Sequence, residues 1–505
     1  MSAIDQIREE LLRASYLKSA EAVLQWDQET YMPPGAGAAR ADQIAFLSGL
    51  IHERMTSERL KEALYELIDL QTGELRTITL NERETRLAKE AWKDYRKEAA
   101  LPAKFVAELS HHASTSQQAW TQARKESNFV TFQPHLEKMV ELQKEKAGYL
   151  SLGGSTYDTL MDLFEPGMTT EQAASLFKAL RQRLVPLIRE IQEVKHRVNN
   201  SVLSKNYDLD KQWSFGEGIL RAIGFDFNHG RQDRSAHPFT TGFHPTDVRT
   251  TTRLRENDLK SALLATLHEG GHALYNMGLP AEEFGNPLGE YISLGIHESQ
   301  SRLWENLVGL STPFWQYAYP KLRATFPEQL KDTDKDQFYA AMNKVRPSMI
   351  RVEADEATYN LHVMLRFEIE QLLINDDLPV AELPALWNDK MEEYIGIRPT
   401  NDSEGVLQDV HWSFGAFGYF PTYTLGNLYS VQFYNQARKD IPGLEDQYAH
   451  GKFAPLLDWL REKIHSKGRS VTASELIMDV TGEELSAEPF LNYLEEKYRG
   501  IYSLG

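Results

Sequence analysis

Apolar residues recur every three or four positions along most of the chain, which is the spacing of one face of an α-helix. The stretch 170–198 is typical, and its apolar stripe consists of Leu176, Leu180, Leu184, Leu187, Ile191 and Val194. Thr169 and Gln172 predict a capping box at its start. Comparable patterns predict helices over 3–28, 38–70, 77–98, 102–126, 131–150, 256–277, 290–310, 333–345, 350–375, 453–466 and 486–499. We therefore expect an all-α protein.

One region departs from this pattern. Residues 237–243 and 247–252 are rich in β-branched and aromatic side chains, and a turn containing Pro245 separates them. This composition predicts a small β-hairpin, with a plain connecting loop as the alternative. An exposed edge strand of such a hairpin can bind an extended peptide through main-chain hydrogen bonds.

The organisation of the chain favours one unit. No internal repeat, low-complexity segment or linker divides the 505 residues. Although this length alone favours several domains, we expect residues 1–505 to form a single unit with two lobes.

Charge and composition argue against several classes of binding partner and kinds of site. Lys and Arg total 55 against 73 Asp and Glu, a net charge of −18, which disfavours binding to nucleic acid or to anionic membranes. Because there is no cysteine, disulfides, thiolate metal sites and cysteine nucleophiles are excluded. The N-terminus does not resemble a signal peptide, and no apolar run is long enough to cross a bilayer. We expect a soluble, cytoplasmic protein.

The most informative stretch is 261–278, which contains the pattern His-Glu-x-x-His. On a helix His268 and His272 lie one turn apart and face the same way, so both can bind one metal ion. Glu269 lies about 100° round the helix, where it can reach a water without being a ligand. Gly270 and Gly271 each cost the helix about 1 kcal/mol relative to Ala. We therefore expect another backbone or a ligand to approach there; the alternative for the whole motif is a chance match.

A catalytic zinc site needs a third protein ligand. Glu298, 26 residues after His272, can supply it from a following helix. Glu305 lies two turns further on and is the competitor, as a solvated carboxylate or as a partner of a ligand. His297 points elsewhere than Glu298, so the two cannot both be ligands.

This set of residues predicts peptide-bond hydrolysis. An ion held by two neutral imidazoles and one carboxylate keeps a positive charge, which lowers the pKa of water bound to it. Glu269 then acts as the general base and returns the proton to the leaving amine.

Six motifs in order resemble those of the M32 metallocarboxypeptidases, bacterial members closely. They are His237-Pro238-Phe239, Asp247-x-Arg249-x-Thr251, His268-Glu269-x-x-His272, His297-Glu298-Ser299-Gln300, Ile350-Arg351-x-x-Ala354-Asp355 and Gly405-x-x-Gln408-Asp409-x-His411-Trp412. The N-terminal stretch 26–33 is also similar to the family, so the resemblance covers essentially the whole chain.

The resemblance implies a two-lobed helical fold with a deep central groove, like that of angiotensin-converting enzyme and the thimet-type oligopeptidases. It implies release of single residues from peptide C-termini with broad side-chain specificity, except that a C-terminal proline is released poorly. It also implies one divalent ion per chain, zinc with cobalt able to substitute, and a homodimer.

An exopeptidase must also bind a free α-carboxylate, for which a buried cation is suited. The candidates are Arg351 and Arg249, with His237 nearby. We favour Arg351, for which an internal ion pair with Glu353, Asp355 or Glu356 is the alternative. For Arg249 we favour a structural role, in which it closes the end of the groove so that only short substrates bind productively.

Peptide hydrolysis passes through a tetrahedral oxyanion, and hydrogen-bond donors to it are expected within residues 408–423. His411 and Tyr423 resemble a donor pair of related folds, whereas a core role for His411 and donation by Tyr419 instead of Tyr423 are the alternatives. Asp409 suits the support of an imidazole.

Two other functions remain open at this point. They are an endo-acting oligopeptidase on the same fold and a non-catalytic peptide-binding module. The intact Glu269 argues against the second, since a binding module has no use for a general base. The negative net charge predicts that acidic peptides are disfavoured at the mouth of the groove.

Overall fold

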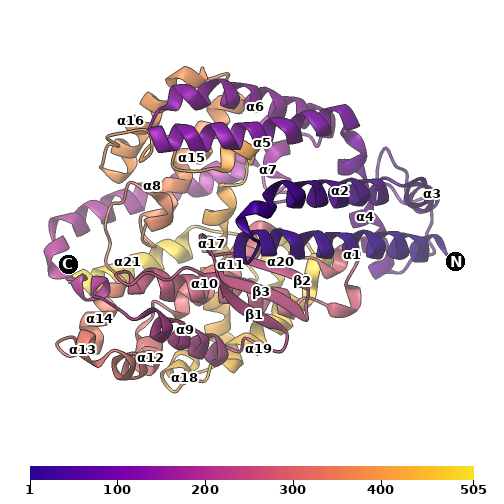
Figure 1. Ribbon diagram of the computed structural model, residues 1–505. Helices are drawn as coiled ribbons and strands as arrows, with labels where there is room; N and C mark the ends of the chain where they lie inside the picture. The colour runs from indigo at the N-terminus through magenta and orange to yellow at the C-terminus, as the bar shows by residue number, and fades with distance from the viewer. Residues whose placement is uncertain (505) are drawn as a thin grey trace.

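Helices form nearly all of the regular structure, as the periodicity predicted. The computed structural model describes residues 1–504. Figure 1 shows an upper lobe around α5 (Ala103–Glu126), α6 (Phe129–Leu150), α15 (Tyr359–Ile374) and α16 (Leu383–Ile395). The lower lobe contains the sheet and α9 (Leu209–Ile223), α12 (Thr312–Thr325), α13 (Pro327–Leu330), α14 (Lys335–Met342), α18 (Leu444–Ala449) and α19 (Ala454–Lys463).

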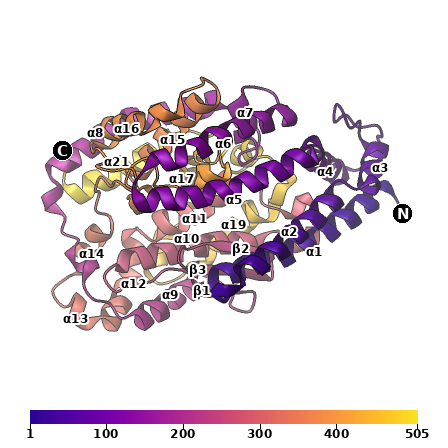
Figure 2. The same cartoon turned by 45° about the horizontal axis from the view of Figure 1, so that its top comes forward.

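Three helices lie between the lobes and carry most of the predicted chemistry. They are α10 (Leu259–Gly278), α11 (Leu294–Arg302) and α17 (Pro421–Asp440). Figure 2 shows that α5 and α6 run across this central layer. The other helices are α7 (Thr156–Met161), α8 (Thr170–Glu193), α20 (Ala473–Thr481) and α21 (Glu488–Tyr502). No helix among the described residues is both long and apolar enough to cross a membrane.

The N-terminal part consists of α1 (Ala3–Thr30), α2 (Gly37–Met55), α3 (Glu58–Leu67) and α4 (Glu82–Ala100). The single helix predicted over 38–70 is wrong, because the chain breaks it at Thr56. The Ser57 side chain accepts a hydrogen bond from the amide of Leu60 and starts a new helix there. The capping box predicted for Thr169 and Gln172 is present at the start of α8.

The predicted hairpin is confirmed, and the loop alternative is wrong. Strands β2 (Thr240–His244) and β3 (Asp247–Thr252) pair antiparallel. A third strand, β1 (Gly230–Arg234), pairs parallel with β3, so the order is β1-β3-β2 and β2 is an edge. Four consecutive polar residues in β1 hid it from the hydrophobic pattern. β2 packs against α1, where Ser19 Oγ donates to the carbonyl of Phe243.

Two predicted helices have different boundaries. The stretch 290–310 becomes α11, capped by Ser293, followed by a π-helical segment at Leu303–Val308. The stretch 350–375 begins with a single 3-10 turn at Arg351–Glu353, and α15 starts only at Tyr359. Asp355 holds the chain between them by accepting hydrogen bonds from the amides of Ala357 and Thr358.

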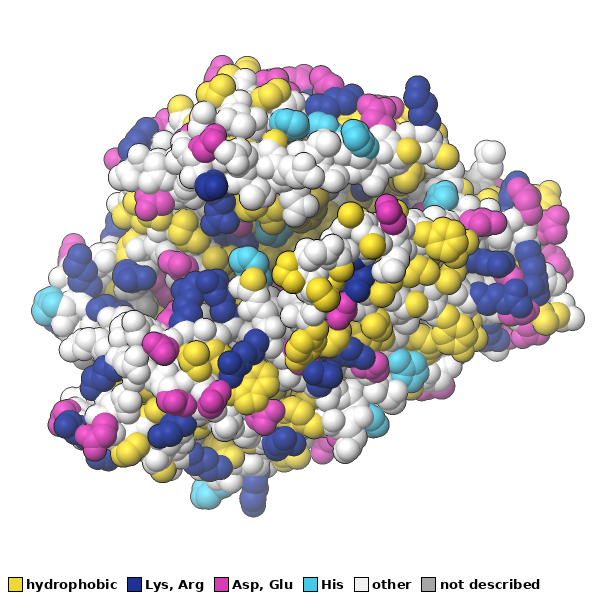
Figure 3. Space-filling view, viewed as in Figure 1, with side chains coloured by type: hydrophobic (Ala, Val, Ile, Leu, Met, Phe, Trp, Pro, Cys, Tyr) yellow, Lys and Arg dark blue, Asp and Glu magenta, His cyan; other side chains and the backbone are white. Residues whose placement is uncertain are grey.

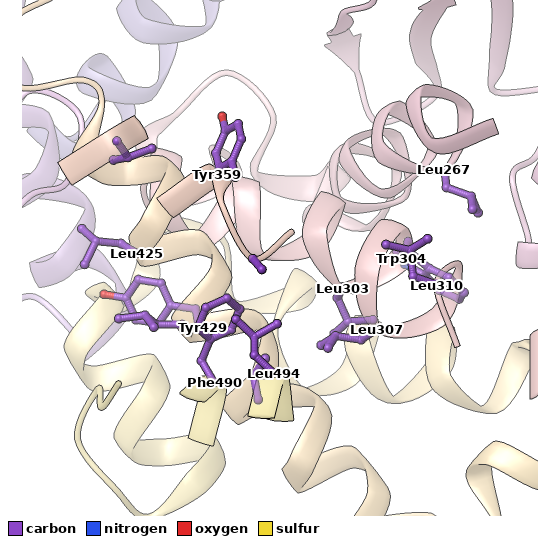
Figure 4. Packing of buried hydrophobic residues seen from close by; sticks show 14 of the residues in the cluster. Leu267, Leu303, Trp304, Leu307, Leu310, Tyr359, Leu425, Tyr429, Phe490 and Leu494 are labelled. Carbon is purple, nitrogen blue, oxygen red and sulfur yellow. The ribbon is translucent and has the colours of Figure 1, made fainter. Parts of the chain in front are cut away.

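A continuous apolar core lies behind the central helices. Figure 4 shows Leu267 of α10 beside Trp304, while Tyr429 of α17 packs with Phe490 and Leu494 of α21. A second, smaller core joins α1, α3 and α4. The central helices are therefore fixed by packing on one face, and the side chains on their other face are held in place.

Glu370 of α15 is a fully buried carboxyl in this core. It accepts hydrogen bonds from Tyr157, Trp412 and the amide of Gly418. Burial outweighs these donors and raises the pKa of Glu370 to about 7 from 4.5. Glu370 thereby joins α7 and α15 to the loop that precedes α17.

The Glu370→Gln variant tests this pKa. A raised pKa stabilises the folded chain below pH 4.5, and that contribution is lost as the pH rises through about 7. The unfolding free energy of the variant minus that of the parent should therefore increase by up to about 3 kcal/mol between pH 5 and pH 8. Urea unfolding across this range measures it, with the exposed Glu171→Gln as the control. A difference that does not change with pH would contradict the raised pKa.

Candidate metal centre

The structure brings the three predicted ligands together. The imidazoles of His268 and His272 lie side by side on α10, with ring centroids 4.8 Å apart. Glu298 reaches them from α11, with its Oε2 at 3.6 Å from His268 Nε2 and 3.3 Å from His272 Nε2. One ligand atom from each residue lies within 4.8 Å of the others. This is a compact set of two nitrogens and one oxygen, as zinc prefers.

Two glycines make this approach possible. A Cβ on Gly271 of α10 would lie 2.6 Å from the backbone oxygen of Gln300 on α11. A Cβ on Gly426 of α17 would lie 2.6 Å from Cγ of Glu298. The close backbone approach expected at the mid-helix glycines is thus present at Gly271. Helix α11 is held between α10 and α17, with Glu298 at the contact.

Each imidazole is held by a second partner through Nδ1. His268 Nδ1 lies 2.8 Å from Glu305, which is largely buried and therefore supports a predicted ligand instead of facing solvent. His272 Nδ1 lies 2.5 Å from His297 Nδ1, and His297 Nε2 lies 2.9 Å from Asn276 Oδ1. His297 is therefore turned away from Glu298, as predicted. These partners direct both Nε2 atoms toward Glu298.

Arg302 completes the charge arrangement. Its guanidinium donates to Glu298 Oε1 at 2.7 Å and to Glu305 Oε2 at 3.1 Å. Burial alone would raise the pKa of Glu298, but Arg302 and the imidazoles hold it below its usual range. Burial alone would lower the pKa of His268, but the charges of Glu298 and Glu305 outweigh this effect and raise the pKa to about 9. The two carboxylates favour a positive charge at this point, so the residues fit a divalent cation.

Glu269 lies beside this cluster and is not part of it. Its side chain is buried at the wall of the cavity, and its Oε2 accepts a 2.7 Å hydrogen bond from Thr240 Oγ1 of β2. The hairpin therefore orients the carboxylate that was predicted to act as the base.

A cavity of about 1670 Å³ opens over the cluster and is lined by residues of both lobes. Figure 3 shows a hollow between the lobes with histidine and basic side chains at its edge. The predicted groove is thus present. His237 is exposed and lines it, together with Tyr359, Tyr419 and Tyr423.

The expected oxyanion donors differ in their positions. The Tyr419 and Tyr423 rings, 5.2 Å apart, both line the cavity. His411 stacks on the ring of Tyr419 and does not line the cavity. Burial lowers the pKa of His411 to about 4, with only partial compensation from Asp409 at 3.8 Å. His411 is therefore a neutral imidazole at neutral pH.

Arg351 lines the cavity, but its charge is already paired. Its Nη2 donates to Asp409 at 2.8 Å and its Nη1 donates to the Tyr359 hydroxyl at 2.8 Å. The partner is thus Asp409, not any of the three carboxylates considered from the sequence. Asp409 also binds the buried Arg366, so it supports two guanidiniums.

Arg249 lies away from the cavity lining. It bonds Asp247 of its own strand, and its guanidinium covers the Trp26 ring at 4.4 Å and the Phe243 ring at 4.8 Å. Its contacts join the sheet to α1.

Thr240, Arg302 and Tyr359 were missed by the sequence interpretation. Arg302 could have been found, because it lies four residues after Glu298 on one helix face. Thr240 and Tyr359 carry no such signal, since their positions depend on how the sheet and α15 pack against the centre.

Removing the charge that supports His268 tests this arrangement. Glu305→Gln should weaken zinc binding about 10- to 100-fold, because the imidazole loses its anionic partner. Titration against a chelator of known affinity measures the change. Glu353→Gln is the matched control, since that carboxylate lines the cavity without contacting either histidine. Equal zinc affinities in the two variants would contradict the role of Glu305.

Comparison with known proteins agrees with this geometry. A family model described as carboxypeptidase Taq (M32) metallopeptidase matches residues 6–498. The chain is 42% identical to thermostable carboxypeptidase 1 of Thermus thermophilus over 499 residues, covering 97% of this chain and 96% of that protein. It matches the M32 carboxypeptidase of Deinococcus radiodurans with a TM-score of 0.95 at 41% identity, covering 99% and 100% of the two chains. For metallocarboxypeptidase 1 of Trypanosoma cruzi the TM-score is 0.92 at 32% identity, covering 98% and 99%. The chain therefore belongs to the M32 family and is a metallocarboxypeptidase.

Proposed function

We propose that the protein releases single residues from the C-termini of peptides, using one divalent ion bound by His268, His272 and Glu298. The observation that supports this most directly is that these three side chains converge beside Glu269, whose carboxylate is oriented by Thr240. Zinc suits two imidazoles and one carboxylate, and cobalt can replace it.

The mechanism relies on Glu269 as the proton carrier. A bound divalent ion supplies Lewis-acid activation of water and of the scissile carbonyl. Glu269, held through one oxygen by Thr240, accepts the proton of the attacking water with the other and passes it to the leaving amine. The Glu269 carboxylate is largely buried yet lines the cavity, so it is held in place while one face stays open to the substrate side.

Tyr423 donates a hydrogen bond to the oxyanion in this proposal, from the wall formed by the start of α17. Tyr419 is the alternative donor, since its hydroxyl reaches the same cavity. Burial raises the pKa of Tyr419 to about 12, so it stays protonated and able to donate. His411 acts behind it, holding the Tyr419 ring by stacking.

His237 and Arg351 are the proposed substrate-binding residues, because both line the cavity. Arg351, whose charge is shared with Asp409, is held in the wall beside Tyr359 and donates to the C-terminal carboxylate in this proposal. Arg249 closes the end of the groove indirectly, by joining β3 to α1. The whole chain acts as one catalytic unit, with broad side-chain specificity and poor release of a final proline.

A cytoplasmic homodimer completes the proposal. The homodimer rests on the family resemblance, and the cytoplasmic location on the lack of cysteine, which is compatible with a reducing compartment. An endo-acting oligopeptidase is the competing function, because the same three ligands and base serve both reactions.

Mass spectrometry of an N-terminally blocked peptide distinguishes these functions. The metal-loaded protein should produce a ladder shortened one residue at a time from the C-terminus, and a chelator should abolish it. Glu269→Gln should keep fold and metal but lower turnover by at least about 10³-fold, because the proton carrier is lost. Internal fragments would indicate the oligopeptidase, and turnover by Glu269→Gln at the parental rate would overturn the mechanism.

A further inference from the structure

One end of the cavity is lined by more basic than acidic side chains, although the chain has a net charge of −18. Helix α10 runs along the cavity, and Lys260, Leu264, His268, His272 and Asn276 line it at four-residue intervals. Beyond the start of α10 the lining consists of residues from 253–261 and 341–355, which we call the basic arm. Figure 3 shows Lys and Arg side chains gathered beside the hollow.

Three cations of the basic arm lack a partner. Within residues 1–504, the side-chain nitrogens of Arg253, Lys260 and Arg346 make no hydrogen bond or ion pair. Lys344 bonds only the neutral amide oxygen of Asn200, at 3.2 Å. Burial lowers the pKa of Lys260, and Asp355 only partly offsets it. An anion entering the arm would therefore meet cations whose charges are not already paired.

Four carboxylates line the basic arm. The Glu256 carboxylate accepts only from Asn206 Nδ2, at 3.3 Å, and the Glu353 side chain has no partner within residues 1–504, so two free carboxylates stand against four cations that lack a carboxylate partner. Asp258 caps α10 by accepting from the amide of Ser261, and it also pairs with Arg255. Asp355 accepts from the backbone amides of Arg346, Ala357 and Thr358. Because protein donors already satisfy these two carboxylates, they compete weakly for the unpaired cations.

The arm is within reach of a bound peptide. Lys260 lies two helical turns before His268, about 12 Å along the axis. An extended peptide advances about 3.3–3.6 Å per residue, so this separation equals three to four residues. Long basic side chains shorten the gap further. A carboxylate a few residues or fewer from the cleaved bond can therefore reach these cations.

Resting on the proposed peptidase function, we propose that Arg253, Lys260 and Arg346 form a binding site for a carboxylate of the peptide. An acidic side chain near the cleaved bond supplies that group, which makes acidic peptides preferred substrates. The terminal α-carboxylate of the peptide is the other group that these cations can bind, and the experiment below distinguishes the two carboxylates. The preference is opposite to the repulsion that the net charge alone predicted.

Peptide affinity, measured without turnover, tests the proposal. The probes are N-acetylated peptides that differ only by Glu or Gln before the C-terminal residue, each with a free or an amidated C-terminus. Calorimetry on zinc-loaded Glu269→Gln protein gives each Kd. The Glu peptide should bind about tenfold more tightly than the Gln peptide. Adding Arg346→Gln or Lys260→Met should reduce this ratio to below about threefold, whereas Arg346→Lys should largely keep it.

The control is Arg189→Gln, which removes one charge from the exposed face of α8, away from the cavity. It should leave every Kd unchanged. If the α-carboxylate is the bound group, the arm variants will instead weaken all free-acid peptides about tenfold and spare the amides. Parental affinities in all arm variants, or an equal loss in Arg189→Gln, would overturn the site. Because binding is read directly, a parent protein that binds but does not cleave would count against the proposed function and not against this site.

Discussion

The close packing of α11 between α10 and α17 is the constraint on which the site depends. Gly271 and Gly426 remove the two side-chain carbons that would otherwise separate these helices, and the contact places Glu298 against both imidazoles. The resulting cluster of Glu298, Glu305 and Arg302 is largely buried, so its charges must compensate one another. A cation bound at the imidazoles would complete that compensation.

The remaining parts of the site are arranged around this packed centre. The edge strand β2 reaches Glu269 through Thr240, and the Tyr419 and Tyr423 rings form the facing wall. Asp409 fixes Arg351 in that wall and also binds the fully buried Arg366, while unpaired cations line the far end of the cavity. The site therefore combines a rigid, charge-compensated centre with a more open region for the peptide.

Local patterns predicted the features that depend on a single element. His268, His272 and Glu269 share one helix, and the β-branched and aromatic composition of 237–243 and 247–252 predicted the hairpin. Contacts between distant segments were not predictable in this way. Nothing in the sequence joins Arg351 to Asp409, and β1 and most of α17 carry too many polar residues for a hydrophobic pattern. The break before Ser57 depended on one capping side chain within a continuous apolar stripe.

Anomalous diffraction from zinc-loaded crystals tests the central claim most directly. The account predicts one strong peak per chain, about 2.0–2.2 Å from Nε2 of His268, Nε2 of His272 and a carboxylate oxygen of Glu298. Glu269 should remain bonded to Thr240 and outside the coordination sphere. A peak at another site, or one coordinated directly by Glu269, would contradict the assignment of ligands and base.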